Sequence, residues 1–303
     1  MLSNNDSKYL TDAPGQKPGF LFHSMVIAIF GTGLIGCSLA YRLRETGFAQ
    51  TFIGVDNNPD NLREARRLGW IDVIMEPEEA LAIAELVILA VPVDVAARIL
   101  PGILDCIGDK PVMDVGSTKK MMGDAVKDHF NRKQYVASHP MWGTEKSGPS
   151  SVVMDAFEGR VSVICDKERS APEALEMIEK LYSDIGMKLV YMDSDVHDMH
   201  AAYVSHISHI ASYALSLTVL EKEKEEDAIF ELASGGFEST VRLAKSHPAM
   251  WVPIFMQNRD NVLDVLNEHI VQLRKFKSCL EKENYTYLQE LITQANSISR
   301  ILK

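Results

Sequence analysis

Short apolar runs alternate with amphipathic segments through the first part of the chain. Between Met25 and Met192 the apolar runs are VIAIF, TFIGVD, LVILAVP, PVMDVGS, QYVASHP, RVSVICD and KLVYMD. Runs of this length that are rich in β-branched residues predict buried strands. Because they alternate with helical segments, they predict a mostly parallel, doubly wound sheet with helices on both faces. In such folds, ligands bind beyond the carboxyl ends of the strands.

The pattern changes to a helical period after Met192 and keeps that period to the C-terminus. We therefore expect an all-α region over residues 193–303. Its stretch HIASYALSLTVL is apolar over more than one helix face, which predicts packing against another subunit and hence a homodimer. The expected division is a flexible tail at residues 1–24, an α/β domain at 25–192 and the all-α domain.

The composition fits a globular protein with two domains. The chain has 303 residues, is 46% hydrophobic and carries a formal net charge of −11. It can bury a large core, but it lacks the basic surface that nucleic acid or an anionic membrane requires. No apolar stretch reaches the length of a membrane span. Four widely spaced cysteines show neither metal-ligand nor disulfide spacing, so we expect reduced, buried thiols and a cytoplasmic protein.

A glycine-rich turn, FGTGLIGCSLA, follows the first apolar run and opens a helical segment. Gly31, Gly33 and Gly36 fit the G-x-G-x-x-G pattern, whose glycines permit the turn, the approach of a pyrophosphate and close packing of helix on strand. The next run ends in Asp56, about 20 residues beyond the last glycine, where a carboxylate meets the adenosine ribose hydroxyls. No arginine adjoins Asp56 to accept a 2′-phosphate, so the pattern favours NAD over NADP. The alternative is an acid that only caps a turn.

Three later apolar runs end in residues that are candidates for cofactor binding or catalysis. AVPV places Val91 and Pro92 where the chain passes the nicotinamide end, DVGSTK places Ser117 at the next strand end, and SHPMWGTEKSG places His139 at another. A histidine at this edge is a natural acid–base group, because its ordinary pKa lies near neutrality. From the residues alone, His139 could equally be a structural histidine.

The all-α region contributes the segment HDMHAAYVSHISH, with His197, His200, His206 and His209. His206 and His209 share one helix face as a metal pair would, but no carboxylate or cysteine set accompanies them, so we expect no metal site. One of the four histidines is expected to face a substrate, and the others to be solvated or at an interface. Farther along, Arg242 follows a glycine pair and is either a ligand for an anionic substrate or a surface residue.

In their order and spacing, these segments resemble the prephenate or arogenate dehydrogenases, which are enzymes of the tyrosine pathway. The resemblance extends from Met25 to the last helices. It rests on the glycine-rich turn, AVPV, DVGSTK, SHPMWGTEKSG, HD…VSHISH and GGF…VRLA…MW…N. It implies a Rossmann-like doubly wound parallel sheet followed by a helical dimerisation domain.

The resemblance also implies roles for individual residues. His139 matches the catalytic histidine of the family, and Ser117 matches the serine that orients it and the substrate hydroxyl. Arg242 matches the arginine that binds a substrate carboxylate. His209 matches a histidine that lines the substrate pocket, and Glu145 matches an acid at the mouth of that pocket.

The candidate site therefore comprises the catalytic pair His139 and Ser117 and two further groups of residues. The substrate-binding candidates are Arg242, His209, Glu145 and Gly235. The cofactor-binding candidates are Gly31, Gly33, Leu34, Ile35, Gly36, Asp56, Val91, Pro92 and Ser117. The segment GGFESTVRLA departs from the commoner family pattern, because Glu238 stands where a basic residue is often found. This departure leaves the polarity of the pocket edge in question.

The implied reaction is the NAD-dependent oxidative decarboxylation of prephenate to 4-hydroxyphenylpyruvate in tyrosine biosynthesis. His139 would accept or hydrogen-bond the proton of the ring hydroxyl. Arogenate is the alternative substrate, since it carries the same ring, and tyrosine is a candidate inhibitor. Two other classes stay open. A β-hydroxyacid or imine-type dehydrogenase usually has a lysine on the first long helix of its second domain, and a non-catalytic NAD-sensing module needs neither His139 nor Ser117.

Overall fold

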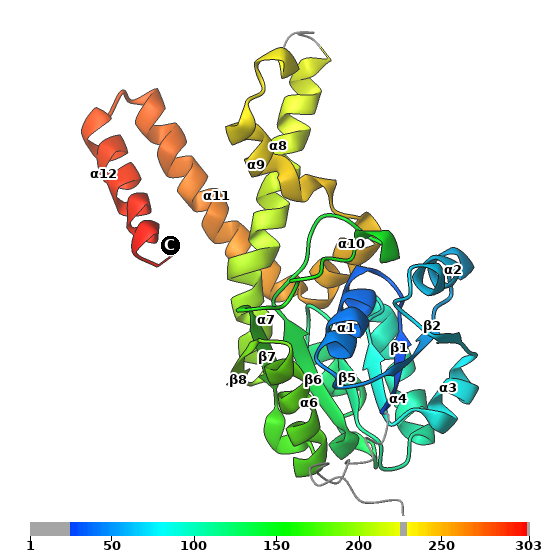
Figure 1. Ribbon diagram of the computed structural model, residues 1–303. Helices are drawn as coiled ribbons and strands as arrows, with labels where there is room; N and C mark the ends of the chain where they lie inside the picture. The colour runs from blue at the N-terminus through cyan, green and yellow to red at the C-terminus, as the bar shows by residue number, and fades with distance from the viewer. Residues whose placement is uncertain (1–24, 225–228, 302–303) are drawn as a thin grey trace, which may run out of the picture.

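The structure is a computed structural model that describes residues 25–224 and 229–301 (Figure 1). The tail expected at residues 1–24 lies outside the described residues. Eight strands form one sheet in the order β3-β2-β1-β4-β5-β6-β7-β8. The strands are β1 Val26–Phe30, β2 Thr51–Val55, β3 Val73–Ile74, β4 Leu86–Leu89, β5 Val112–Asp114, β6 Tyr135–Pro140, β7 Val161–Cys165 and β8 Lys188–Met192.

All neighbouring strands of the sheet run parallel except β6 and β7, which are antiparallel. A parallel pair needs a long crossover connection, usually a helix. Only the short 3₁₀ helix Pro149–Ser151 lies between β6 and β7, so the chain returns in the opposite direction. The predicted mostly parallel, doubly wound sheet is confirmed, with one reversal near its edge.

Helices cover both faces of the sheet, because alternate residues of a strand point to opposite sides. In β1, Ile27 and Ile29 belong to the core beneath α1, α2 and α6, whereas Ala28 and Phe30 belong to the core beneath α3, α4 and α5. The helices of this domain are α1 Leu34–Glu45, α2 Pro59–Arg67, α3 Pro77–Ile83, α4 Val93–Cys106, α5 Lys120–Ala125 and α6 Pro172–Asp184.

The helical domain begins directly after β8, and its first helix passes through a π-helical turn at Ala202–His206. Among residues 193–224 and 229–301 no strand occurs, in agreement with the predicted all-α region. The α-helices are α7 Ser194–Ala201, α8 Ile207–Glu223, α9 Gly235–Val241, α10 Pro248–Gln257, α11 Arg259–Glu281 and α12 Tyr285–Asn296.

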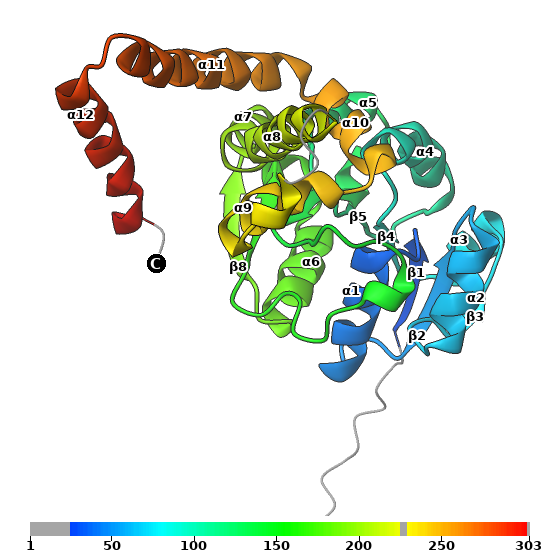
Figure 2. The same ribbon diagram turned by 90° about the horizontal axis from the view of Figure 1, so that it is seen from above.

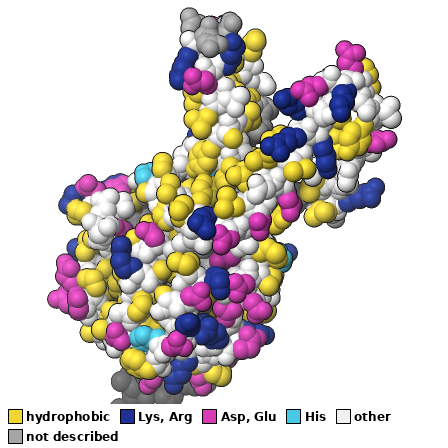
Figure 3. All heavy atoms as spheres, turned by 180° about the vertical axis from the view of Figure 1, so that it is seen from behind, with side chains coloured by type: hydrophobic (Ala, Val, Ile, Leu, Met, Phe, Trp, Pro, Cys, Tyr) yellow, Lys and Arg dark blue, Asp and Glu magenta, His cyan; other side chains and the backbone are white. Residues whose placement is uncertain are grey.

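Helix α8 projects away from the sheet together with α9, and α11 and α12 project in another direction, so that they form an arm of two diverging parts (Figures 1 and 2). The only buried residues of α8 are His209 and Ser212. Leu217 and Leu220 of the same helix are 66% and 50% exposed. Figure 3 shows hydrophobic side chains gathered along this arm. The apolar stretch predicted to be an interface is therefore uncovered in the single chain.

The two domains meet where α10 packs on α4. Val93 of α4 lies in one buried cluster with Trp251 and Ile254 of α10. The Thr118 hydroxyl donates a hydrogen bond of 2.6 Å to Gln257 Oε1, close to the same contact. These contacts fix the helical domain over the carboxyl edge of the sheet, where the sequence predicts ligands.

One expectation about the cysteines is wrong. Cys37, Cys165 and Cys279 are buried, but Cys106 is exposed because it is the last residue of α4, beyond the face that packs on the sheet. All four cysteines are free thiols. Within residues 25–224 and 229–301, no helix is both long enough and apolar enough to cross a membrane.

Candidate active site

The glycine-rich turn joins β1 to α1 at the carboxyl edge of the sheet. Gly31 has a φ of +100°, which favours glycine, and a Cβ there would overlap the carbonyl group of Ala90. A Cβ on Gly36 would overlap the carbonyl oxygen of Gly31. Gly33, the N-cap of α1, has no neighbour within 4 Å of such a Cβ. The turn thus leaves open space at a helix N-terminus, which suits a pyrophosphate.

Asp56 is hydrogen-bonded to this turn. Its Oδ2 atom accepts hydrogen bonds from the Thr32 backbone N–H at 2.7 Å and from the Thr32 hydroxyl at 3.0 Å. Its Oδ1 atom accepts the backbone N–H of Asn58 at 2.8 Å. The carboxylate therefore stands between the turn and the end of β2. The other predicted cofactor residues begin α1 or lie before α4, namely Leu34, Ile35, Val91 and Pro92.

His139 lies near the end of β6, and only 8% of its surface is exposed. Its Nδ1 atom is 2.9 Å from Nε2 of His197 on α7. The Nδ1 atom of His197 is in turn 2.8 Å from Oδ1 of Asp198. Both α7 residues are 2% exposed. The structure therefore brings together a buried row of two imidazoles and one carboxylate, contributed by both domains.

The hydrogen bonds of this row assign its tautomers. A carboxylate only accepts, so His197 donates from Nδ1 to Asp198. When His197 carries its single proton on Nδ1, its Nε2 atom is an acceptor, and His139 donates to it from Nδ1. The lone pair of His139 Nε2 is left as the acceptor. Among the described residues no hydrogen bond engages that atom, so it is available to a ligand.

The surroundings of His139 favour its neutral form. Burial holds its pKa well below 6.5, and the nearby His197, Lys119 and His206 lower it further. A buried imidazole loses hydration when it is protonated, and adjacent cations oppose the new charge. At neutral pH, His139 is therefore a base that is ready to accept a proton.

Asp198 is held in place by three kinds of contact. The backbone N–H of Lys119 donates to Oδ1 at 2.8 Å, and that of Lys120 donates to Oδ2 at 3.1 Å. The side-chain amide of Asn258, before α11, donates to the carbonyl oxygen of Asp198 at 2.6 Å. The carboxylate that orients His197 is therefore fixed by the segment after β5, and the backbone of Asp198 is fixed by the residue before α11.

The structure does not pair Ser117 with His139 as the resemblance implies. Ser117 lies on the bend after β5 and is partly buried, but no hydrogen bond joins it to His139 within the described part of the chain. His197 occupies the Nδ1 side of His139 instead. Ser117 remains at the carboxyl edge of the sheet, where a cofactor or substrate hydroxyl would lie.

His209 stacks on Trp251, with ring centroids 3.4 Å apart. Its Nδ1 atom donates to the carbonyl oxygen of Ser205 at 3.2 Å, so its Nε2 atom is an acceptor. Burial lowers the pKa of His209 to about 4, and Arg242 contributes to the lowering. His206, one helix turn away, is fully buried, and burial likewise lowers its pKa to about 4. Both imidazoles are neutral at physiological pH.

Arg242 and Glu145 meet across the two domains. Arg242 begins the 3₁₀ turn after α9, and its Nη1 atom donates to Oε2 of Glu145 at 2.8 Å. The two side chains are 50% and 21% exposed. A backbone hydrogen bond and the guanidinium hold the pKa of the Glu145 carboxyl below its ordinary value. Both residues predicted for the substrate pocket are thus brought together, and Arg242 is also near His209.

Two sequence candidates lie apart from this group. Gly235 is exposed at the first residue of α9, and His200 is exposed on α7. Of the four histidines, His197 rather than His200 reaches the buried row. In the described ranges no group of three or more His, Cys, Asp or Glu side chains is arranged so that it could hold a metal ion.

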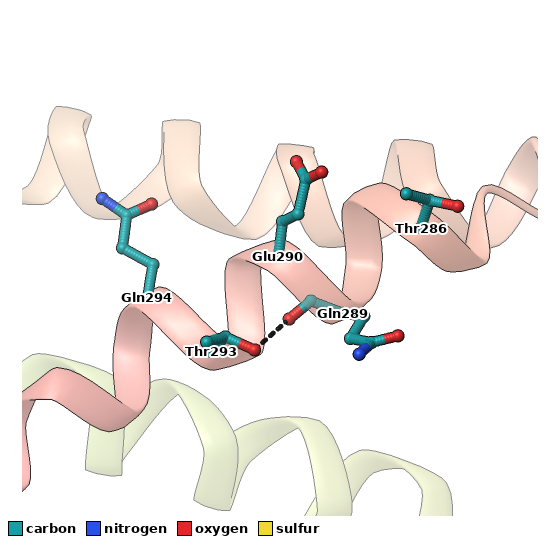
Figure 4. Close-up of a pocket in the computed structure, with 5 residues that line it drawn as sticks. All are labelled: Thr286, Gln289, Glu290, Thr293 and Gln294. Atoms are coloured by element: carbon teal, nitrogen blue, oxygen red, sulfur yellow. Dashed lines mark hydrogen bonds between the residues drawn. The ribbon is translucent and has the colours of Figure 1, made fainter.

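Two pockets of the described residues do not include His139. One follows a polar face of α12 and contains none of the candidate residues (Figure 4). Within it, the Thr293 hydroxyl donates to the carbonyl oxygen of Gln289 at 2.8 Å, a bond inside the helix. A second pocket is lined by Lys120, Asp198 and residues 256–261, so it adjoins the carboxylate end of the buried row. Neither pocket includes His139, so the site is assigned from the buried row of His139, His197 and Asp198.

The sequence alone does not single out Asp198 or Lys119, and it does not distinguish His197 from the other histidines of its segment. The available signal was the pair HD, because a carboxylate next to a histidine in sequence can fix its tautomer. The HD pair indicates a catalytic role only once the fold places His197 against β6.

Comparison with known proteins assigns both halves of the chain to the family that the sequence resembles. A family described as "Prephenate dehydrogenase, nucleotide-binding domain" matches residues 39–191, and one described as "Prephenate dehydrogenase, dimerization domain" matches residues 193–294.

Individual relatives extend over most of the chain. The prephenate dehydrogenase of Bacillus subtilis is 29% identical and aligns with 85% of this chain and 71% of its own length. The cyclohexadienyl dehydrogenase of Zymomonas mobilis is 28% identical, with 91% and 96% covered. A crystal structure of prephenate dehydrogenase from Aquifex aeolicus, in complex with hydroxyphenyl propionate and NAD+, is 27% identical. It superposes with a TM-score of 0.80 over 93% of this chain and 99% of that one.

Proposed function

Because this chain belongs to the prephenate dehydrogenase family, we propose that it catalyses the NAD-dependent oxidative decarboxylation of prephenate to 4-hydroxyphenylpyruvate. The observation that carries the proposal is the buried row of His139, His197 and Asp198, which leaves Nε2 of His139 as a free acceptor. The relatives are named prephenate dehydrogenase and cyclohexadienyl dehydrogenase. Prephenate is therefore the proposed substrate and arogenate the alternative.

The residues of the glycine-rich turn fit a dinucleotide. The open space at Gly33 and the N-terminus of α1 suit the pyrophosphate, and Asp56 suits the ribose hydroxyls. Bound NAD+ would supply the hydride acceptor. The Aquifex aeolicus relative was crystallised with NAD+, which supports this choice.

His139 carries the proton chemistry. Its Nε2 atom accepts the proton of the ring hydroxyl while the hydride leaves the same ring carbon, so the carbon–oxygen bond becomes a carbonyl. Breaking of the bond to the ring carboxylate releases CO2 and leaves its electron pair in the ring, which becomes aromatic. The phenolate oxygen that results takes the proton back from His139. A fixed base of this kind contributes roughly 10²- to 10⁴-fold to the rate.

His197 and Asp198 stabilise protonated His139 between the two proton transfers. The imidazolium of His139 donates from Nδ1 to His197, which donates to Asp198. Arg242 supplies a planar fork for a substrate carboxylate, worth roughly 1.5–3 kcal/mol for each charge-assisted hydrogen bond. In the ligand-free chain this fork is paired with Glu145, which balances its charge at the pocket mouth.

We propose that the enzyme is a homodimer assembled through the helical domain. The support is the exposed apolar surface of α8, together with the family assignment of residues 193–294. The free thiols fit a reducing cytoplasm. Light scattering at micromolar concentration should give the mass of two chains, and a stable monomer would contradict this assembly.

Turnover with defined substrates tests the function. NADH formation is followed with prephenate and with arogenate, each with NAD+ or NADP+ and with or without tyrosine. We expect the highest kcat/KM with prephenate and NAD+, and we propose that tyrosine inhibits. A preference for arogenate would keep the chemistry and change the substrate. No turnover with either compound would favour a β-hydroxyacid or imine-type dehydrogenase or an NAD-sensing module, although α7 and its π-helical turn carry no lysine.

A further inference from the structure

Lys119 is a fully buried lysine next to the catalytic row. It belongs to the segment after β5, and its side chain has no exposed surface. Its Nζ atom forms an ion pair with Oδ2 of Asp114, which is also fully buried, and donates to the carbonyl oxygen of Ser138 at 2.6 Å. A buried ion pair costs desolvation energy and is weak evidence for stability. Its position against the strand of His139 therefore calls for another explanation.

The Lys119–Asp114 pair replaces the sheet ladder at the residue before His139. The parallel register of β5 and β6 ends at Met113 and Val136. Beyond it, the backbone N–H of Ser138 donates to Oδ1 of Asp114 at 3.2 Å, and the carbonyl oxygen of Ser138 accepts from Lys119. Both backbone polar groups of Ser138 are thus hydrogen-bonded to one pair of side chains. This pair fixes the backbone of β6 at the residue before His139.

The other end of the same residue reaches the second imidazole. The backbone N–H of Lys119 donates to Oδ1 of Asp198, the same oxygen that accepts from His197. Lys119 is therefore bonded to the strand that carries His139 and to the carboxylate that orients His197. One residue connects the parts contributed by the two domains.

We propose that Lys119 is a positioning residue of the catalytic site. It fixes His139 against His197 through Ser138 and Asp198, and its buried charge keeps His139 in the neutral, proton-accepting form. The proposal rests on the proposed function for its kinetic consequence, but its effect on the protonation of His139 is independent of the substrate.

Three titratable groups face His139 from the elements packed against it. They are His197 from α7, His206 from the π-helical turn and Lys119 from the segment before α5. Two carboxylates lie one contact beyond, Asp114 paired with Lys119 and Asp198 bonded to His197. Lys119 is the ammonium group of this set. Its removal should raise the pKa of His139, because a cation disfavours a second positive charge nearby.

The test replaces Lys119 by methionine, which keeps the length of the side chain and removes the charge. The protonation of His139 is followed by NMR of its Cε1–H resonance, which is assigned by its loss in His139→Asn. We expect the titration midpoint in Lys119→Met to move up by about one pH unit, and the acid limb of kcat to move with it. We expect kcat to fall about tenfold or more, with KM and the Kd for NAD+ changed less than about threefold.

Lys127→Met is the matched control. Lys127 follows α5, and its side chain is exposed. The control should titrate and turn over like the wild type. Because Lys119→Met leaves the Asp114 carboxylate buried and unpaired, it can fail to fold. The double variant Lys119→Met/Asp114→Asn removes both charges and should show a smaller upward shift, because the negative charge of Asp114 is lost together with the ammonium.

The outcomes separate this proposal from the proposed function. An unchanged titration of His139 in the folded variant, or a fall in kcat equal at every pH, would overturn the assignment and leave Lys119 as a structural residue. Absence of turnover in the wild type with either cyclohexadienol would refute the proposed function. The NMR titration would still decide the role of Lys119.

Discussion

Arg242 Nη1 lies 2.8 Å from Glu145 Oε2, so a residue of the helical domain pairs with one of the sheet domain at the predicted pocket mouth. We expect Arg242→Gln to raise KM steeply and to cost about 2–4 kcal/mol, or roughly 30- to 1000-fold in kcat/KM, because a substrate carboxylate loses its fork. Arg242→Lys should restore only part of this loss, since an ammonium is a point charge. Steady-state kinetics measure both variants.

Lys245→Gln provides the control for Arg242. Lys245 lies on the same 3₁₀ turn, is 61% exposed on its side chain and stands 3.8 Å from Glu238. Its replacement should leave KM unchanged. Unchanged KM in both Arg242 variants would remove that residue from the site and leave it as a surface ion-pair partner.

His197 and His200 offer a matched pair on one helix. His197 is buried against His139, whereas His200 is exposed three residues farther along α7. We expect His197→Asn to lower kcat about tenfold or more, because it removes the partner that orients His139 and stabilises its imidazolium. His200→Asn should retain wild-type kcat. Equal kinetics for the two variants would contradict the role of the buried row.

Much of the fold could be predicted from the sequence because its signals are local. The apolar runs are the strands β1, β2 and β4 to β8, and the change of period at Met192 coincides with the end of β8. The two-residue strand β3 has too short a pattern to be recognised. The reversal at β7 depends on a connection without a crossover helix, which periodicity does not encode.

The site was only partly predictable, because its contacts join distant segments. His139 was found from its position at a strand end. Its partner His197 is separated from it by the whole of β7, α6 and β8, and the bond between them exists only after the domains pack. The same holds for Lys119, since a lysine in DVGSTK carries no sign that it will be fully buried.

The cofactor preference follows from Asp56. We expect Asp56→Ala to weaken NAD+ binding about tenfold and to narrow the preference over NADP+, because the proposed role of the carboxylate is to bind the ribose hydroxyls and repel a 2′-phosphate. The control is Thr32→Val, which removes the hydroxyl bond to Asp56 and keeps the backbone bond. It should leave the preference intact. More efficient use of NADP+ than NAD+ by the wild type would show that the end of β2 has been misread.

The buried His209 makes stability depend on pH. Burial lowers its pKa from 6.5 to about 4 in the folded protein. Below 6.5 the unfolded chain binds a proton that the folded protein does not, so the stability from the neutral imidazole is complete above this pH and is lost as the pH falls toward 4. We expect His209→Gln to reduce the loss of unfolding free energy between about pH 7 and 5 by about 1–2 kcal/mol.

Denaturant titrations at the two pH values measure this difference. The exposed His200→Gln is the control and should keep the pH dependence of the wild type. An equal pH dependence in His209→Gln would show that His209 titrates in the folded protein as it does in the unfolded chain.

The kcat of His139→Asn measures whether His139 is the base in the proposed prephenate dehydrogenase reaction. With prephenate and NAD+, we expect kcat to fall at least about a hundredfold, because the asparagine amide cannot take the hydroxyl proton. The Kd for NAD+ should stay unchanged, since His139 acts on the substrate and not on the dinucleotide. Turnover of prephenate by His139→Asn at close to the wild-type rate would contradict the account.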